Sequence, residues 1–222
     1  MIGIYGSPVS NCYNTVVAAA EYKQLGYVGE AVPASRDSAF LQRSPMGKIP
    51  YIKHEEVNLS ETSAIVEYFD EVFAGPKLFP GTALQRARQR QLMKFIELYV
   101  ESPARRLFPG VFWFMDNDPL HIDEVRPVME RGLIAAELIL ADKDYPQDGA
   151  PNAAEFYTYF SLALAGRVTE SQYNWSITEA KPLLKKLMLK IGRLDFVNVL
   201  CSQRDEAMTA YLNKKAAEAA AR

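Results

Sequence analysis

Apolar and polar positions alternate over short stretches in the first third of the chain. Strand patterning covers residues 2–5 and 27–32, and between them a helical pattern runs over roughly 12–25 and ends at Gly26. Two more short apolar runs, 51–52 and 57–59, flank a polar turn and predict a hairpin. Apolar residues then recur at helical spacing from 62 to 73. The pattern predicts the order β–α–β, a polar connector, then β–β–α.

The rest of the chain shows helical patterning without strands. We expect a long amphipathic helix over about 83–107, interrupted by Ser102-Pro103 and Pro109-Gly110, and a second over about 120–141. Asn152 and Glu155 form a variant capping box before a buried helix over about 156–164. Two further helices are expected over about 179–194 and 195–212, and the alanine-rich end 214–222 is expected to fray.

These patterns predict two domains. The first, 1–76, has the βαβ-ββα order of a thioredoxin-like α/β domain, and a linker, 77–83, joins it to an all-α domain, 84–222.

The charge and residue composition of the chain argue against several classes of function. The net charge of -2 shows no basic excess, so we expect neither a nucleic-acid partner nor binding to anionic lipid. No apolar run approaches the ~20 residues of a membrane span, and no signal peptide is visible. Two distant cysteines and two histidines lack zinc spacing, so no metal is expected. The low cysteine content favours a reducing compartment, the cytoplasm.

The most informative stretch runs from Ser44 to Ile52 and continues from Leu59 to Ile65. Pro45 and Gly47 mark a tight turn, and Pro50, at the start of a strand, is a candidate for a cis peptide bond. The helix that begins just after Glu61 leaves its first N–H groups without internal partners, which favours binding of a carboxylate there.

This stretch resembles the glutathione-binding half of the glutathione S-transferase family, and the resemblance is specific over about the first third of the chain. It implies that glutathione is the co-substrate. The Ile49-Pro50 main chain would hold its cysteinyl part, and Glu61-Thr62, with threonine in place of the usual serine, its γ-glutamyl end. The glycine carboxylate would lie near two cations, Lys48 in the turn and Arg36 in the connector.

Glutathione transfer needs a thiolate near neutral pH. Lowering a thiol pKa of about 8.5 by two units takes about 2.7 kcal/mol. One charge-assisted hydrogen bond of about 1.5–3 kcal/mol plus a helix N-terminus of about 0.5–1 kcal/mol can supply it. Ser10 lies at the expected entry to the first helix and resembles the serine of the phi, theta and zeta classes. It also fits a helix N-cap, and the two roles could coexist.

Three alternatives to the Ser10 assignment stay open. Cys12 could be the nucleophile of a thiol-transferase, although a small packed residue is the commoner use of such a cysteine. Tyr5 could activate the thiol but lies in the first strand. Asn11, Thr62 and Ser44 differ from the usual family residues, which leaves open a glutathione-binding module without turnover.

The second substrate would be a small apolar electrophile bound by the helical domain. Aromatic residues near the broken end of its first long helix are the candidate pocket: Tyr99, Phe108, Phe112 and Trp113. At helical spacing such residues are more often core. The predicted function is a glutathione transferase that conjugates, isomerises or reduces its substrate, and the resemblance also implies a homodimer.

Overall fold

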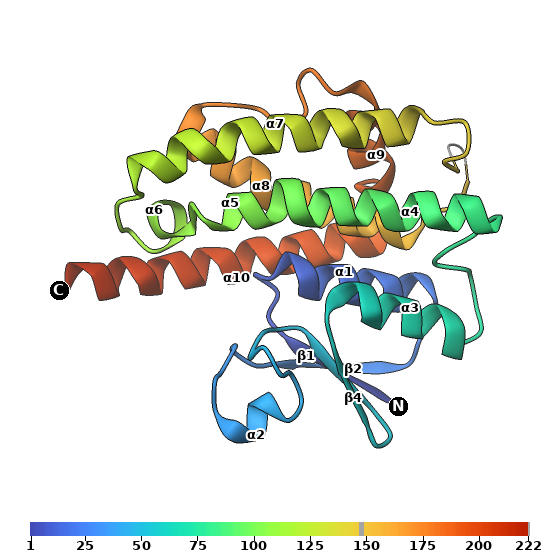
Figure 1. Cartoon of the computed structure of the whole chain (residues 1–222). Coiled ribbons are helices and arrows are strands. Elements are labelled where there is room, and N and C mark those ends of the chain that lie inside the picture. Colours follow the sequence, from blue (N-terminus) through green and yellow to red (C-terminus); the bar gives the residue numbers. More distant parts are fainter. Residues whose placement is uncertain (147–148, 222) are drawn as a thin grey trace.

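The protein consists of a small mixed sheet flanked by helices and a larger helical part stacked beside it, as shown in Figure 1. The computed structural model describes residues 1–146 and 149–221. The predicted domain range 84–222 therefore includes residues 147, 148 and 222, which lie outside the described part. The boundaries 1–76, 77–83 and 84–222 remain a prediction.

The sheet has four strands in the order β2-β1-β3-β4. β1 (Ile2–Gly6) pairs in parallel with β2 (Tyr27–Ala31) and antiparallel with β3 (Tyr51–His54), which forms a hairpin with β4 (Val57–Ser60). Ile2 and Ile4 alternate with less buried residues because successive strand side chains point to opposite faces.

Two helices cover the face of the sheet that looks toward the helical part (Figure 1). They are α1 (Asn11–Tyr22) and α3 (Thr62–Val72), whereas the short α2 (Ser38–Leu41) lies on the other side. An unbroken run of buried residues, 14–20, lets α1 pack on both the sheet and the helix α8. The predicted β–α–β, β–β–α order is confirmed, with α1 three residues shorter than expected at its C-terminal end.

The second part is built only of helices among the described residues. The bounds are α4 (Ala83–Ile96), α5 (Ser102–Arg105), α6 (Phe108–Phe112), α7 (Pro119–Ala141), α8 (Ala153–Tyr173), α9 (Pro182–Ile191) and α10 (Asp195–Ala220). The capping box at the start of α8 is present: the Asn152 side chain accepts from the Glu155 N–H, and the Glu155 carboxylate accepts from the Asn152 N–H. Phe156 and Phe160 are buried, so α8 forms the centre of this part.

The first long helix is interrupted earlier than the sequence predicts. A π-helical turn, η1 (Glu97–Glu101), joins α4 to α5, and the Ser102 N–H bonds the Glu97 carbonyl five residues back. Pro103 has no N–H to offer the Tyr99 carbonyl, so the wider turn forms just before it. Gly132 of α7 packs here, where a Cβ would lie 2.8 Å from the Tyr99 carbonyl oxygen.

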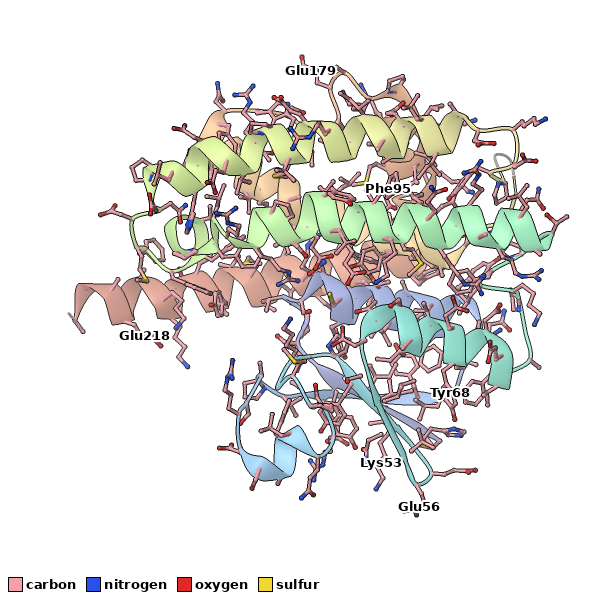
Figure 2. The ribbon with its side chains drawn as sticks, viewed as in Figure 1. Lys53, Glu56, Tyr68, Phe95, Glu179 and Glu218 are labelled. Carbon is pink, nitrogen blue, oxygen red and sulfur yellow. The ribbon has the colours of Figure 1, made fainter. Side chains whose placement is uncertain are left out.

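The end of the chain also differs from expectation. The last helix was expected to end near residue 212, whereas α10 (Asp195–Ala220) continues through most of the alanine-rich tail. In Figure 1 this helix projects past the other helices, and Figure 2 shows Glu218 near its end. Among the described residues, no helix combines the length and apolar character that crossing a bilayer requires.

Candidate active site

A cleft of about 430 Å³ opens between the first part and the helical part. One wall comes from the loop before α1, the turn before β3 and the start of α3. The other comes from η1, α5, α6, α8 and α10. The predicted residues Ser10, Lys48, Ile49, Pro50, Glu61, Thr62, Phe108, Phe112 and Trp113 all line it.

Ser10 is the N-cap of α1. Its backbone is extended, and its Oγ accepts a hydrogen bond of 3.3 Å from the Tyr13 N–H. A serine hydroxyl has two acceptor lone pairs and one proton. The cap uses only one lone pair, so the hydroxyl proton is available to a group in the cleft. The N-cap role is therefore compatible with donation to a thiolate.

The turn before β3 holds its backbone toward the cleft. The Ile49-Pro50 peptide bond is cis. The buried Ser44 hydroxyl donates to the Lys48 carbonyl at 2.8 Å, and the Gly47 N–H donates to the Ser44 carbonyl at 2.8 Å. Gly47 has φ +66°, and a Cβ there would run into the Ser35 carbonyl oxygen, so glycine is needed. Serine at position 44 thus fastens the turn that presents Ile49.

The start of α3 forms the far end of the cleft. Glu61 is exposed and has φ 72°, a left-handed conformation that costs a non-glycine residue on the order of 1–3 kcal/mol. Its side chain makes no capping bond to α3. The first N–H groups of this eleven-residue helix open beside Glu61 and Thr62, where a carboxylate is favoured.

The two predicted cations are placed differently. Lys48 is exposed and lines the cleft. Arg36 is exposed in the connector and lies outside the lining residues, although Ala34, two positions earlier, is one of them. The structure therefore brings Lys48, but not Arg36, to the cleft.

The helical wall of the cleft is aromatic. Phe108 and Phe112 pack edge to face with ring centroids 4.9 Å apart, and the Trp113 Nε1–H donates to the Tyr211 hydroxyl at 2.9 Å. Tyr211 and Met208 of α10 complete this wall, and neither residue was predicted to line it.

Tyr99 does not belong to the aromatic wall. Its ring packs edge to face on Phe95, 5.8 Å away, and its backbone faces Gly132 of α7. Figure 2 shows Phe95 on the side of α4 toward α7. The π turn makes the helix wider than an α-helical projection assumes, so Tyr99 lies at the α4–α7 contact instead of in the cleft.

A polar network lies beneath the cleft and joins the two parts of the protein. The Glu101 carboxylate accepts from Ser161 Oγ at 2.7 Å and from Arg105 Nη2 at 2.7 Å. Arg105 Nη2 also donates to Asn11 Oδ1 at 2.8 Å, and Asn11 Nδ2 donates to Ser161 Oγ at 3.2 Å. Burial alone would raise the pKa of Glu101, but the Arg105 charge and these hydrogen bonds hold it below its ordinary value.

Neither alternative to Ser10 suits its role: Cys12 as a nucleophile or Tyr5 as a thiol activator. Burial and the nearby Glu101 charge raise the pKa of the Cys12 thiol to about 12. The Cys12 thiol lies 3.5 Å from Glu101 Oε1, where a thiolate would meet a second negative charge. Burial and Glu30 raise the pKa of Tyr5, whose ring stacks on Tyr51 and does not line the cleft.

The residues of this polar network were not predicted from the sequence. Asn11 and Arg105 are 94 positions apart, and Glu101 and Ser161 are 60 apart, so no local spacing links them. The available signal was Pro103, which marks a helix irregularity beside Glu101 and Arg105. Among the described residues, no group of three or more His, Cys, Asp or Glu side chains could hold a metal ion.

Comparisons with known proteins agree with this geometry. Residues 4–77 match the family model described as glutathione S-transferase, N-terminal domain. Over 212 residues, 96% of both chains, the protein is 28% identical to a protein of Pseudomonas putida F1 named glutathione S-transferase. A probable maleylacetoacetate isomerase of Vibrio cholerae is 32% identical over 95 residues, 40% of this chain and 44% of the isomerase.

Solved structures show the same fold. Glutathione transferase F7 of Populus trichocarpa superposes with a TM-score of 0.75 at 19% identity, covering 92% of this chain and 99% of the other. A maleylacetoacetate isomerase of Methylobacterium extorquens AM1, solved with malonate and glutathione, gives a TM-score of 0.73 at 21% identity, covering 91% of this chain and 97% of the other. The predicted thioredoxin-like first part and all-α second part are confirmed, and residues 4–77 match the N-terminal domain of the glutathione S-transferase family.

Proposed function

We propose that this protein is a glutathione transferase in which Ser10 stabilises the glutathione thiolate. The observation that supports this most directly is that one cleft contains the Ser10 N-cap, the Ile49-Pro50 turn and the start of α3. These three elements supply, in order, a hydroxyl donor for sulfur, an exposed main chain for a peptide, and a helix end for a carboxylate.

Glutathione lies along this wall with its γ-glutamyl end at Glu61 and Thr62. Its cysteinyl backbone pairs with the main chain at Ile49, ahead of Pro50, and its glycine carboxylate reaches toward Lys48. The Ser10 hydroxyl donates to the sulfur, whose charge is also favoured by the N-terminus of α1. Together these two effects, of about 1.5–3 and 0.5–1 kcal/mol, can lower the thiol pKa by about two units.

The thiolate then attacks a small electrophile held against Phe108, Phe112 and Trp113. Conjugation, reduction of a peroxide and reversible addition that isomerises a double bond all begin with this attack. One relative is named a transferase and another a probable isomerase. An aromatic wall is compatible with all three reactions. We therefore propose thiolate attack as the shared step.

A glutathione-binding module without turnover is the second candidate. This candidate is suggested by three residues that differ from those usual in the family: Asn11, Ser44 and Thr62. The Ser44 hydroxyl supports the turn before β3, and Thr62 keeps a hydroxyl at the start of α3, so neither departure removes a contact that the proposed chemistry needs. Glutathione binding without activity toward any electrophile or peroxide would favour the module.

The pKa of bound glutathione tests the proposal. Ultraviolet thiolate absorbance is titrated in the wild type, Ser10→Gly and Ser7→Ala. Glycine is a tolerable N-cap, so Ser10→Gly removes the hydroxyl and costs only a few tenths of a kcal/mol in helix stability. We expect the bound thiol pKa to rise by about one to two units in Ser10→Gly.

Ser7 is the matched control because it is a serine of the same loop that lies outside the cleft lining. Ser7→Ala should leave the bound thiol pKa unchanged. An unchanged pKa in Ser10→Gly would remove Ser10 from the mechanism. Calorimetry that detects no binding of millimolar glutathione would defeat the transferase proposal altogether.

Assembly and location complete the proposal. We propose a homodimer, which light scattering coupled to gel filtration tests directly. We also propose a cytoplasmic location, in keeping with the free thiols at Cys12 and Cys201. Fractionation of cells that express the tagged chain checks it.

A further inference from the structure

Arg105 lies between the start of α1 and the aromatic wall of the cleft. Its Nη2 lies 2.8 Å from Asn11 Oδ1 and 3.8 Å from Cys12 Sγ, both at the start of α1. On the other side its guanidinium lies 5.3 Å from the centroid of the Phe108 ring. Arg105 therefore reaches from the aromatic wall to the residues directly after Ser10.

The Arg105–Glu101 ion pair is oriented with its cation toward the cleft. The side chain of Arg105 is 42% exposed, whereas that of Glu101 is 6% exposed. Arg105 Nε and Nη2 both donate to Glu101 Oε1, at 3.0 and 2.7 Å. Among the described residues Nη1 of Arg105 donates no hydrogen bond, so this nitrogen can still donate to an anion. An anion bound in the cleft would therefore contact the Arg105 guanidinium and not the buried Glu101 carboxylate.

The π-helical turn η1 orients the Arg105–Glu101 pair. Without η1, residues after Glu97 would be rotated about the helix axis relative to their present positions. Gly132 allows α7 to approach the widened turn. Such bulges are frequent at functional sites. Here the bulge brings Glu101 and Arg105, one helical turn apart, over the start of α1.

We propose that Arg105 is the cation that stabilises the glutathione thiolate from the helical side of the cleft, opposite the hydroxyl of Ser10. The inference rests on the proposed function, because it assumes that glutathione occupies this cleft. In this arrangement Arg105 supplies the positive charge and Asn11 positions its guanidinium near Ser10. The negative charge of Glu101 partly offsets the attraction between Arg105 and the thiolate.

Other charged and titratable groups also line the cleft, and each can contribute to the pH dependence of thiolate binding. Lys48 is the other cation among the described lining residues, and it lies on the turn before β3. Three acids line the cleft as well: Glu61, Glu97 and Glu101. The neutral titratable groups are Cys12, Tyr157 and Tyr211.

The test uses two substitutions with opposite expected signs. Arg105→Gln removes the cation, so the pKa of bound glutathione should rise by about one unit. Glu101→Gln removes the counter-charge and leaves the cation in place, so the same pKa should fall. A merely structural role of the network predicts that both substitutions loosen the site and raise the pKa together.

Arg106→Gln is the matched control. Arg106 is the neighbouring arginine, pairs with Glu124 at 2.8 Å and lies outside the cleft lining, so its loss should leave the bound thiol pKa unchanged. Arg105→Gln leaves Glu101 buried without its partner, so the double variant Arg105→Gln/Glu101→Gln is measured as well. The double variant should keep a raised thiol pKa.

Two outcomes overturn the proposal: a wild-type pKa in Arg105→Gln, or a raised pKa in Glu101→Gln. Either can occur while Ser10→Gly still raises the pKa of bound glutathione, in which case the transferase proposal stands and only the role of Arg105 is lost. Absence of glutathione binding to the wild type would instead remove both proposals.

Discussion

At the scale of single residues, a side chain with both an acceptor and a donor can serve the fold and the chemistry together. The Ser10 Oγ accepts the Tyr13 N–H and keeps its proton. The choice between N-cap and thiol activator is therefore not exclusive, as the sequence had left open. Cys12, two positions later, shows the opposite case, because its surroundings suppress the thiolate that its residue type could form.

Cys12 should be inert toward oxidised glutathione at neutral pH. With its pKa raised to about 12, roughly one thiol in 10⁵ is ionised at pH 7. Only the thiolate attacks a disulfide. Peptide mapping by mass spectrometry should find no mixed disulfide at Cys12, with the Cys12→Ala variant as reference. A Cys12–glutathione adduct would revive the thiol-transferase alternative.

At the scale of elements, one acid fastens α3 to the start of the connection into the helical part. Asp70 of α3 is buried, and its carboxylate accepts from the Leu78 N–H at 2.7 Å and from the Phe79 N–H at 3.2 Å. The wholly buried Lys23 ammonium lies 3.4 Å from the same carboxylate and donates to the Pro76 carbonyl at 3.0 Å. This cluster holds the end of α1 and the connection together.

Asp70→Asn should lower the free energy of unfolding by about 1–3 kcal/mol. One carboxylate oxygen is replaced by an amide NH2 group, which donates and cannot accept a hydrogen bond, and a buried ammonium loses its counter-charge. Denaturant unfolding measures the change. Glu71→Gln, on the same helix but exposed, should alter stability by less than about 0.5 kcal/mol. Equal losses in both variants would mean that the cluster contributes little.

At the scale of the whole molecule, the two parts meet through α1 and α8 and through the Glu101 network. The pKa of Glu101 is lowered in the folded protein, so the unfolded chain binds its proton first as the pH falls. The stability that this carboxylate contributes is present above its ordinary pKa and is lost as the pH falls through its folded value.

Acid should therefore weaken the contact between the two parts, and Glu101→Gln should flatten that dependence. Thermal melting followed from neutral pH to below pH 4 compares the wild type with Glu101→Gln. Part of the acid loss of stability should be missing in the variant, because glutamine has no proton to bind in this range. Parallel pH profiles would show that Glu101 is not a source of the acid sensitivity. Glu124→Gln, at an exposed ion pair, is the control.

Much of the fold follows from local patterns. Strand alternation, the helix beginning at Thr62 and the Asn152–Glu155 cap depend on residues a few positions apart, and each was predicted. The error at Tyr99 arose because distant packing modified a local preference. Tyr99 fits a helical stripe that faces the cleft, but the π turn and Gly132 move it to α7. The alanine-rich tail continues as a helix to Ala220, as the high helix propensity of alanine favours.

The half of the candidate site for which we propose glutathione binding was recognisable in the sequence because a turn, a proline and a helix start lie within one short stretch. Backbone chemistry of this kind is encoded locally: Gly47 by its positive φ, Pro50 by its ring, and Glu61-Thr62 by the open N–H groups that follow them. The helical half was not recognisable. Glu101, Arg105 and Ser161 become a network with Asn11 only when α1, η1, α5 and α8 pack together. A charge acquires its partner, its burial and its direction from neighbours distant in sequence, so only the tertiary structure could turn Arg105 toward the cleft.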